Sequence, residues 1–201
     1  EGGSIESDGM GTLLTTSRCL LNPNRNAQLD KTQIERILMD DLGVERILWL
    51  DHGYLAGDDT DSHIDTLARL CPEDTIVYVK CQDESDEHFQ ELRQMEDELK
   101  SFRTASGEPF RLIPMPMPDA VFDEDGERLP ATYANYLVMN SAVLYPTYAQ
   151  ADKDDAARLS LQKAFPKHDI VPVDCRPLIR QHGSLHCATM QFPKGVLRGK
   201  E

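Results

Sequence analysis

The chain has 201 residues, of which 40% are hydrophobic and 28% charged, so it is long enough to bury a sizeable core and has the composition of an ordinary folded domain. Its formal net charge of −14 excludes nucleic acid as a partner, because phosphates would be repelled, and suits a cationic substrate. No apolar run approaches the length of a membrane span and no signal peptide is recognised, which indicates a cytoplasmic protein without a membrane partner.

The cysteine pattern indicates a reducing compartment. Five cysteines are present, an odd number, and none forms a C-x-x-C pair, which argues against a disulfide framework and against a zinc ribbon. Four of them lie in or beside apolar runs and are interpreted as core thiols: Cys19, Cys71, Cys81 and Cys175. Only Cys187 remains as a separate case.

The first 50 residues predict two strands, a helix and a third strand. The chain opens with a hairpin, in which the turn 8–11 connects the residues before it to a β-branched strand at 12–16. After a polar loop, Asp30 can cap a helix that Gly43 ends, and residues 46–50 form a short buried strand. The apolar residues of that helix recur at helical spacing: Ile34, Ile37, Leu38 and Leu42.

The same order of elements returns twice. Strands are predicted at 64–70 and 75–80, followed by a helix that Asp86 opens and a strand at 110–113. Strands at 136–139 and 142–145 then precede a helix at 152–165 and a strand at 169–173. The repeat is a strand-strand-helix-strand unit with a period of about 60 residues. The expected fold class is therefore α/β.

The domain organisation follows from this repeat. We expect one domain portion over residues 1–201, with units at about 1–50, 64–114 and 134–174 and a final segment at 181–193. Residues 114–118 and 119–130 are interpreted as solvated connections between units. Neither end resembles a cap, so we expect one or two further units upstream of residue 1, and the exposed ends would favour a homo-oligomer.

An acidic stretch lies between two apolar runs. Residues 57–65 contain four aspartates and one histidine. If a strand begins here, His63 and Asp65 point to one face, because side chains alternate with a period of two. Clustered carboxylates beside buried strands indicate a cationic partner, either a metal ion or a guanidinium. The alternative is that Asp59 and Asp61 belong to a solvated loop.

A second candidate site lies near the C-terminus. Cys187 follows a glycine-containing turn at the start of a strand-like segment, 184–192. It could be a nucleophile activated by a nearby imidazole, a core thiol, or a metal ligand together with His182 and His186. The spacing of the aspartates in 59–65 resembles a calcium loop but lacks its glycine and its final glutamate.

Four stretches together resemble the agmatine deiminase and bacterial-type peptidyl-arginine deiminase family. They are the opening Glu-Gly-Gly-Ser-Ile-Glu-Ser-Asp-Gly-Met-Gly-Thr-Leu-Leu, the loop Leu-Asn-Pro-Asn-Arg-Asn at 21–26, the acidic stretch at 57–65 and Ser-Leu-His-Cys-Ala-Thr-Met-Gln at 184–191. The resemblance implies the pentein fold, a five-bladed α/β propeller, of which about three units would be present here and about two upstream.

The resemblance also implies roles for individual residues. Cys187 matches the family's nucleophile and His63 its general acid/base, while Asp65 and Glu1 match carboxylates that bind the guanidinium. Asp59 and Asp61 are further candidates for substrate binding. The family's upstream aspartate and tryptophan have no counterpart in this sequence. The implied reaction needs no metal and no organic cofactor.

The expected substrate is a small cationic guanidine. The first hypothesis is hydrolysis of agmatine to N-carbamoylputrescine and ammonia, a step of polyamine biosynthesis, through a covalent cysteine thiouronium. The glutamine-histidine-glycine-serine turn at 181–184 departs from the glycine run common in agmatine deiminases, so peptidyl-arginine or another guanidine is the alternative substrate. Two other hypotheses are a non-catalytic fragment and a metal-dependent hydrolase that uses Asp59, Asp61, His63 and Asp65.

Overall fold

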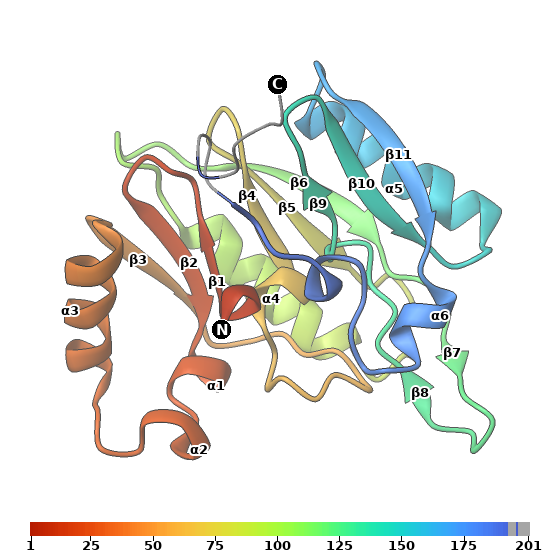
Figure 1. Cartoon of the computed structure of the whole chain (residues 1–201), viewed down its shortest axis with the longest axis horizontal. Helices are drawn as coiled ribbons and strands as arrows, with labels where there is room; N and C mark the ends of the chain where they lie inside the picture. Colours follow the sequence, from red (N-terminus) through yellow and green to blue (C-terminus); the bar gives the residue numbers. More distant parts are fainter. Residues whose placement is uncertain (193–195, 197–201) are drawn as a thin grey trace.

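A computed structural model describes residues 1–192 and 196 of the chain. Three three-stranded mixed sheets lie side by side across the molecule, and helices flank them, with α3 and α5 at opposite outer sides (Figure 1). Residue 193, the last of the expected cysteine segment, lies outside the described residues. Within the described part of the chain, no helix combines the length and the apolar character needed to cross a membrane.

The first unit contains β1 (Ile5–Ser7), β2 (Thr12–Thr16), α3 (Lys31–Leu42) and β3 (Arg46–Leu50), preceded by the short helix η1 (Gly2–Ser4). Strand β2 pairs antiparallel with β1 and parallel with β3. Two short helices, α1 (Ser17–Leu20) and α2 (Pro23–Asn26), form the connection to α3. The predicted cap is confirmed: Asp30 and Gln33 form a reciprocal capping box, and Gly43 ends α3 with φ of 66°.

The second and third units repeat this order. The second has β4 (Ala68–Cys71), β5 (Thr75–Lys80), α4 (Phe89–Ser101) and β6 (Arg111–Pro116). The third has β9 (Leu137–Val138), β10 (Ala142–Thr147), α5 (Ala151–Ala164) and β11 (Asp169–Asp174). In each unit the middle strand again pairs antiparallel with the first strand and parallel with the third. The predicted strand-strand-helix-strand repeat is therefore confirmed as architecture.

The remaining elements connect the units and carry the C-terminal segment. Along the chain, a small hairpin of β7 (Val121–Phe122) and β8 (Arg128–Leu129) connects the second unit to the third. The short helices α6 (Arg176–Ile179) and η3 (His186–Ala188) follow the third unit. One hydrophobic core runs through the second and third units and reaches β2 and β3 of the first. Its largest fully buried side chains include Tyr133, Tyr136, Leu14, Leu50 and Met95.

Four of the predicted features are wrong in detail. Residues 114–118 are not a solvated connection, because they contain the end of β6 and the buried side chains of Met115 and Met117. The apolar run 64–70 is not one strand: residues Ile64–Thr66 form a 3-10 helix, η2, and the strand starts only at Ala68. The run was misinterpreted because its apolar spacing does not reveal two buried polar residues: Thr66 donates to the His63 carbonyl within the turn, and Asp65 accepts from His186, far along the chain. Helix α4 begins at Phe89 rather than Asp86, and 184–192 contains η3 instead of a strand.

Candidate active site

The acidic loop that precedes η2 is held in place from the first sheet. The two threonines at the end of β2 are buried, and each donates a hydrogen bond to a neighbouring segment: Thr15 to the Ser4 carbonyl at 2.7 Å and Thr16 to the Ser62 carbonyl at 2.7 Å. Asp58 accepts from the Ser62 amide at 3.0 Å and closes the loop on itself. These bonds fix η1 and η2 relative to each other, and with them the residues at their starts.

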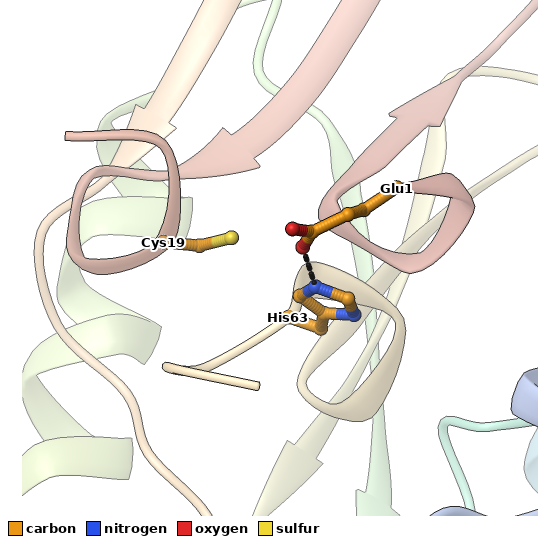
Figure 2. Close-up of side chains that lie close together, drawn as sticks. All are labelled: Glu1, Cys19 and His63. Carbon is orange, nitrogen blue, oxygen red and sulfur yellow. Dashed lines mark hydrogen bonds and ion pairs between the residues drawn. The ribbon is translucent and has the colours of Figure 1, made fainter. Parts of the chain in front are cut away.

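His63 lies at the start of η2 and contacts Glu1. Its ring Nε2 is 2.7 Å from Glu1 Oε2, and Figure 2 shows the carboxylate directed at the ring. Arg25, from α2, grips the same carboxylate with Nε at 3.1 Å from Oε1 and Nη2 at 3.0 Å from Oε2. The hydrogen bonds from Arg25 and His63 lower the pKa of Glu1 to about 2. Glu1 is therefore ionised at neutral pH, and its carboxylate orients the His63 ring.

Arg25 also binds the acidic loop. Its Nη1 is 2.7 Å from Asp61 Oδ2, and its Nη2 donates to the Thr60 carbonyl at 2.9 Å. The cationic partner expected for the acidic stretch is therefore Arg25 of the same chain, as far as Glu1 and Asp61 are concerned. Asp59 is exposed and makes no side-chain hydrogen bond or ion pair within the described part of the chain.

Asp65 is buried with only 1% of its surface exposed. Its Oδ2 accepts from His186 Nδ1 at 2.7 Å, whereas Oδ1 has no hydrogen-bond partner among residues 1–192 and 196. A buried carboxylate oxygen without a donor is costly, and a cation with several N–H groups would satisfy it. Asp65 therefore keeps an unused acceptor beside the residue that precedes Cys187.

Cys187 is the exposed member of the five free cysteines, and the other four are buried. It lies in η3, at the end of a turn that His182 ties to the acidic loop through a 2.8 Å contact from its Nδ1 to the Gly57 carbonyl. Loss of solvation raises the pKa of Cys187, and the nearby charge of Asp65 raises it further. In the substrate-free protein the sulfur is consequently held mainly as the neutral thiol.

A cavity of about 1100 Å³ brings these residues together. The first strand of each unit contributes to its wall: Glu6 on β1, Arg69 on β4 and Val138 on β9. The cavity is also lined by side chains that can transfer protons, bind a cation or act as a nucleophile: His63, Asp65, His186 and Cys187. Three of the six predicted site residues, His63, Asp65 and Cys187, therefore line one cavity, and Glu1 contacts one of them, His63.

Gly3 allows η1 to approach this wall closely. A Cβ atom at Gly3 would lie 2.6 Å from His63 Nδ1 and 2.8 Å from Asp65 Oδ2, closer than real Cβ contacts allow. The sequence offered Gly2 and Gly3 only as part of a family motif. The structure shows that Gly3 alone is needed for this approach, because nothing lies within 4 Å of a Cβ at Gly2.

The proposed metal-ligand set Asp59, Asp61, His63 and Asp65 does not converge, because Asp61 pairs with Arg25 and Asp65 with His186. The group of three ligand atoms that does converge in the described residues belongs to Glu1, Cys19 and His63, all within 4.8 Å of one another. Figure 2 shows the Cys19 sulfur pointing toward the Glu1 carboxylate. Burial raises the pKa of Cys19 to about 11, and Arg25 already neutralises Glu1, so this group is poorly suited to a cation.

Sequence reasoning missed the contacts of Arg25 and Asn135 and the buried ion pair between Glu6 and Arg69, whereas the prediction of Cys19 as a core thiol is confirmed. The role of Arg25 as a partner of the carboxylates could have been predicted, because Arg25 is the charged residue in a loop, 21–26, whose other residues are neutral. Asn135 gave no signal. It lies in a wholly buried stretch, 131–136, whose side chains look like core in the sequence.

The family model for Porphyromonas-type peptidyl-arginine deiminase matches residues 1–193. A curated relative from Marinomonas sp. (strain MWYL1), named "Putative agmatine deiminase", is 37% identical over 210 residues, which cover 96% of this chain and 56% of the relative. The chain therefore spans just over half the length of the curated relatives it matches.

Solved structures show the same fold. A structure from Porphyromonas gingivalis, named "Putative Arginine Deiminase", is 56% identical with a TM-score of 0.95 and covers 98% of this chain and 58% of that one. A C. jejuni agmatine deiminase with substrate bound is 46% identical with a TM-score of 0.86 and covers 92% of this chain and 54% of that one. The α/β fold with mixed sheets is common to all of them.

Proposed function

This chain belongs to the Porphyromonas-type peptidyl-arginine deiminase family, and from that premise we propose that it is the part of a deiminase that carries the cysteine nucleophile. The preferred substrate in this proposal is agmatine, which is the substrate in the names of the curated relatives. Peptidyl-arginine, which the family description names, is the alternative. The observation that carries the proposal is that Cys187, His63 and Asp65 line the same cavity.

The site chemistry fits a planar cation. A guanidinium donates hydrogen bonds along its edges, and the unpartnered Oδ1 of Asp65 is an acceptor for one of them. The positive charge that arrives with the substrate would offset the charge of Asp65 and lower the pKa of Cys187. Substrate binding and formation of the thiolate would then be coupled, and the thiol would stay unreactive until a guanidine is present.

The first half of the proposed reaction forms a bond between sulfur and carbon. The Cys187 thiolate adds to the guanidinium carbon, and His63 supplies a proton so that one nitrogen leaves as ammonia, which gives a thiouronium. Because Nε2 of His63 is engaged by Glu1, the ring nitrogen left for proton exchange is Nδ1, which lies against Gly3 at the cavity.

In the second half, His63 takes a proton from water, and the hydroxyl oxygen attacks the same carbon. The carbon–sulfur bond breaks, and the ureido product leaves with the water oxygen, N-carbamoylputrescine if the substrate is agmatine. The Cys187 thiolate is regenerated. The remaining proton of the water leaves with the ammonia, so one guanidinium and one water give one neutral ureido product and one ammonium ion per turnover.

The finer architecture is part of the same proposal. Three strand-strand-helix-strand units, each of which places its first strand at the cavity, are what three blades of a five-bladed propeller would present. The curated relatives are longer than this chain by an amount that leaves room for two such units. The upstream aspartate of the family's site would come from them.

The test measures ammonia and ureido product from agmatine, free arginine and an arginine-containing peptide, with the chain as given and with the longest product of its gene. The proposal expects one of these guanidines to be hydrolysed, iodoacetamide to abolish turnover and chelators to leave it unchanged. Turnover by the longer product alone would mean that the site needs upstream residues. Failure of both proteins on every guanidine would refute the deiminase, and sensitivity to chelators would favour the metal-dependent hydrolase.

A further inference from the structure

Helix α4 and the residue before it hold the chain segment that leads into the acidic loop. Two glutamates of the helix, Glu91 and Glu98, accept hydrogen bonds from the backbone N–H groups of residues 51–53, each at 3.1 Å. His88 lies directly before the helix, and its ring Nε2 is 2.8 Å from the Ala56 nitrogen. The segment is irregular, so its backbone donors are paired by these side chains rather than by a neighbouring strand.

The contacts of His88 assign its protonation state. None of its surface is exposed, and its second ring nitrogen, Nδ1, lies 2.5 Å from Asp86 Oδ1. The Ala56 nitrogen is a donor, so the Nε2 that faces it must be an acceptor, and the ring proton is assigned to Nδ1, which donates to Asp86. Burial lowers the pKa of His88 below its ordinary value, which favours the same neutral form. The contact with Ala56 therefore requires an uncharged ring.

Charged and titratable groups face His88 from three elements. Asp86 and Glu87 precede α4, and Arg128 of β8 pairs with them at 2.9 and 3.1 Å. Tyr54, from the irregular segment, stacks on the ring with centroids 4.9 Å apart. Against the effect of burial, hydrogen bonds lower the pKa of Asp86 to about 2, and a hydrogen bond from Tyr54 lowers the pKa of Glu87. Between about pH 5 and 8, His88 is consequently the member of this group whose charge can change.

A continuous set of hydrogen bonds leads from Ala56 to His63. Ala56 lies in a turn that the Asp58 amide closes on the Leu55 carbonyl at 3.1 Å. The Asp58 carboxylate accepts from the Thr60 hydroxyl, and the Thr60 oxygen in turn accepts from the His63 amide at 3.2 Å. The backbone of His63 is therefore positioned through the turn at Ala56.

We propose that His88 is a positioning residue for the candidate site, whose neutral imidazole holds the turn at Ala56 and, through the acidic loop, His63. A proton on Nε2 would point at the Ala56 N–H group, so protonation removes the acceptor and releases the turn. His88 is not among the described residues that line the cavity, so it acts on the site only through the loop. The inference rests on the proposed function only for the catalytic role of His63.

Three other histidines lie in or against the loop and keep their partners when they are protonated. His182 Nδ1 lies 2.8 Å from a backbone carbonyl of the loop, to which a histidine can donate in either protonation state. His52 Nδ1 lies 3.4 Å from Glu91 Oε2, so a proton on this ring adds an ion pair. The same holds for His63, whose Nε2 is 2.7 Å from Glu1. Release of the turn at acid pH is therefore specific to His88.

The experiment measures hydrogen exchange by mass spectrometry between pH 5 and 8, without substrate, in the longest product of the gene. The readout is the protection of residues 54–58, corrected for the intrinsic pH dependence of exchange. His88→Gln carries an amide oxygen that can reach the position of Nε2, whereas the shorter His88→Asn can replace only Nδ1 and leaves Ala56 without an acceptor. The matched control is His52→Gln, the same change at a partly exposed histidine of the same segment.

In the wild type, protection of 54–58 should fall by up to about 10-fold per pH unit below about pH 6.5, because the open loop frees an ordinary imidazole that takes up a proton. His88→Gln should remove this dependence, and His52→Gln should retain it. His88→Asn should lower the protection at neutral pH by about 10-fold, the size expected for one buried hydrogen bond. Protection that does not change with pH in the wild type, or that is unchanged in His88→Asn, would overturn the proposal.

A second measurement needs no variant and keeps the test valid if the His88 variants do not fold. At neutral pH, the nitrogen-15 resonances of the wild-type His88 ring should show a protonated Nδ1 and an unprotonated Nε2. The other tautomer, or a charged ring, would overturn the proposal.

Turnover separates positioning of the site from a purely structural role. With a guanidine that the protein hydrolyses, His88→Asn should lower kcat by about 10-fold with a smaller change in KM, because His63 is displaced, and His88→Gln should recover most of the loss. A released loop with an unchanged kcat would overturn the positioning role. A protein that hydrolyses no guanidine but shows the pH-dependent protection would refute the proposed function and leave the hold of His88 on the loop intact.

Discussion

The pair of Arg69 and Glu6 is the feature whose removal should cost the most stability. Arg69 is 5% exposed, and its Nε lies 2.7 Å from Glu6 Oε2. Its Nη1 also donates to the carbonyls of Ala134 and Tyr136, at 3.2 and 2.8 Å, so it connects β1, β4 and the segment that carries Asn135. Burial raises the pKa of Glu6, and Arg69 opposes that rise.

Arg69→Met removes the cation and keeps much of the side-chain volume. Breaking a buried pair by removing one partner typically costs about 3–5 kcal/mol, because the other charge is left buried without compensation. We expect a loss of about that size in the free energy of unfolding, measured by urea denaturation with the fluorescence of Trp49, the only tryptophan. The loss should be larger at alkaline than at mildly acid pH, because protonation of Glu6 relieves its burial.

The double variant Arg69→Met, Glu6→Gln decides whether the cost is electrostatic. Because it has no buried carboxylate left without a cation, the double variant should recover a clear part of the stability lost in Arg69→Met. Arg93→Met, an exposed arginine on α4, is the matched control and should stay within about 0.5 kcal/mol of the wild type. A loss below about 1 kcal/mol in Arg69→Met, or no recovery in the double variant, would refute the reasoning.

Three further predictions concern the candidate site. Gly3→Ala should lower turnover by about 100-fold in steady-state kinetics, because the added Cβ would displace His63 and Asp65. The control Gly2→Ala should have no effect, and equal losses in the two variants would contradict the close approach of η1. Glu1→Gln should lower the free energy of unfolding above pH 4.5 and lower it progressively less as the pH falls toward 2, because the ionised carboxylate is the form that stabilises the fold. Urea denaturation at several pH values measures this, and a difference that does not change with pH would contradict it. Cys187→Ser should abolish turnover and remove the exposed thiol that iodoacetamide reaches, whereas Cys19→Ser, which removes a buried thiol, should leave alkylation at Cys187 in place, as peptide mass mapping would verify.

The repeat of elements could be predicted because each unit obeys local rules. The apolar spacing of α3, the cap at Asp30 and the glycine at 43 act within a few residues of one another, so the sequence records them directly. The run 64–70 was misinterpreted because apolar spacing alone does not reveal that Asp65 and Thr66 are buried, with Thr66 bonded in a turn and Asp65 bonded to the distant His186. Local rules thus give the units but not the exceptions that the site requires.

The candidate site was predictable only where a motif preserves it. Cys187, His63 and Asp65 were identified by resemblance, and the structure places all three around one cavity. The contacts of Arg25 with Glu1 and of Asn135 with Cys187 span 24 and 52 residues of sequence, which no periodicity records. Glu1 was predicted to bind substrate, a role that stays a prediction, and the structure adds its contacts with His63 and Arg25.

Arg25 connects several segments of the candidate site through one side chain. Its guanidinium pairs with Glu1 and with Asp61 and also donates to the Thr60 carbonyl, so α2 is linked both to the residue before η1 and to the acidic loop. A single substitution at position 25 would therefore leave two carboxylates without their cation and would release the loop that precedes η2 at the same time. The orientation of His63 consequently depends on Arg25 as well as on Glu1.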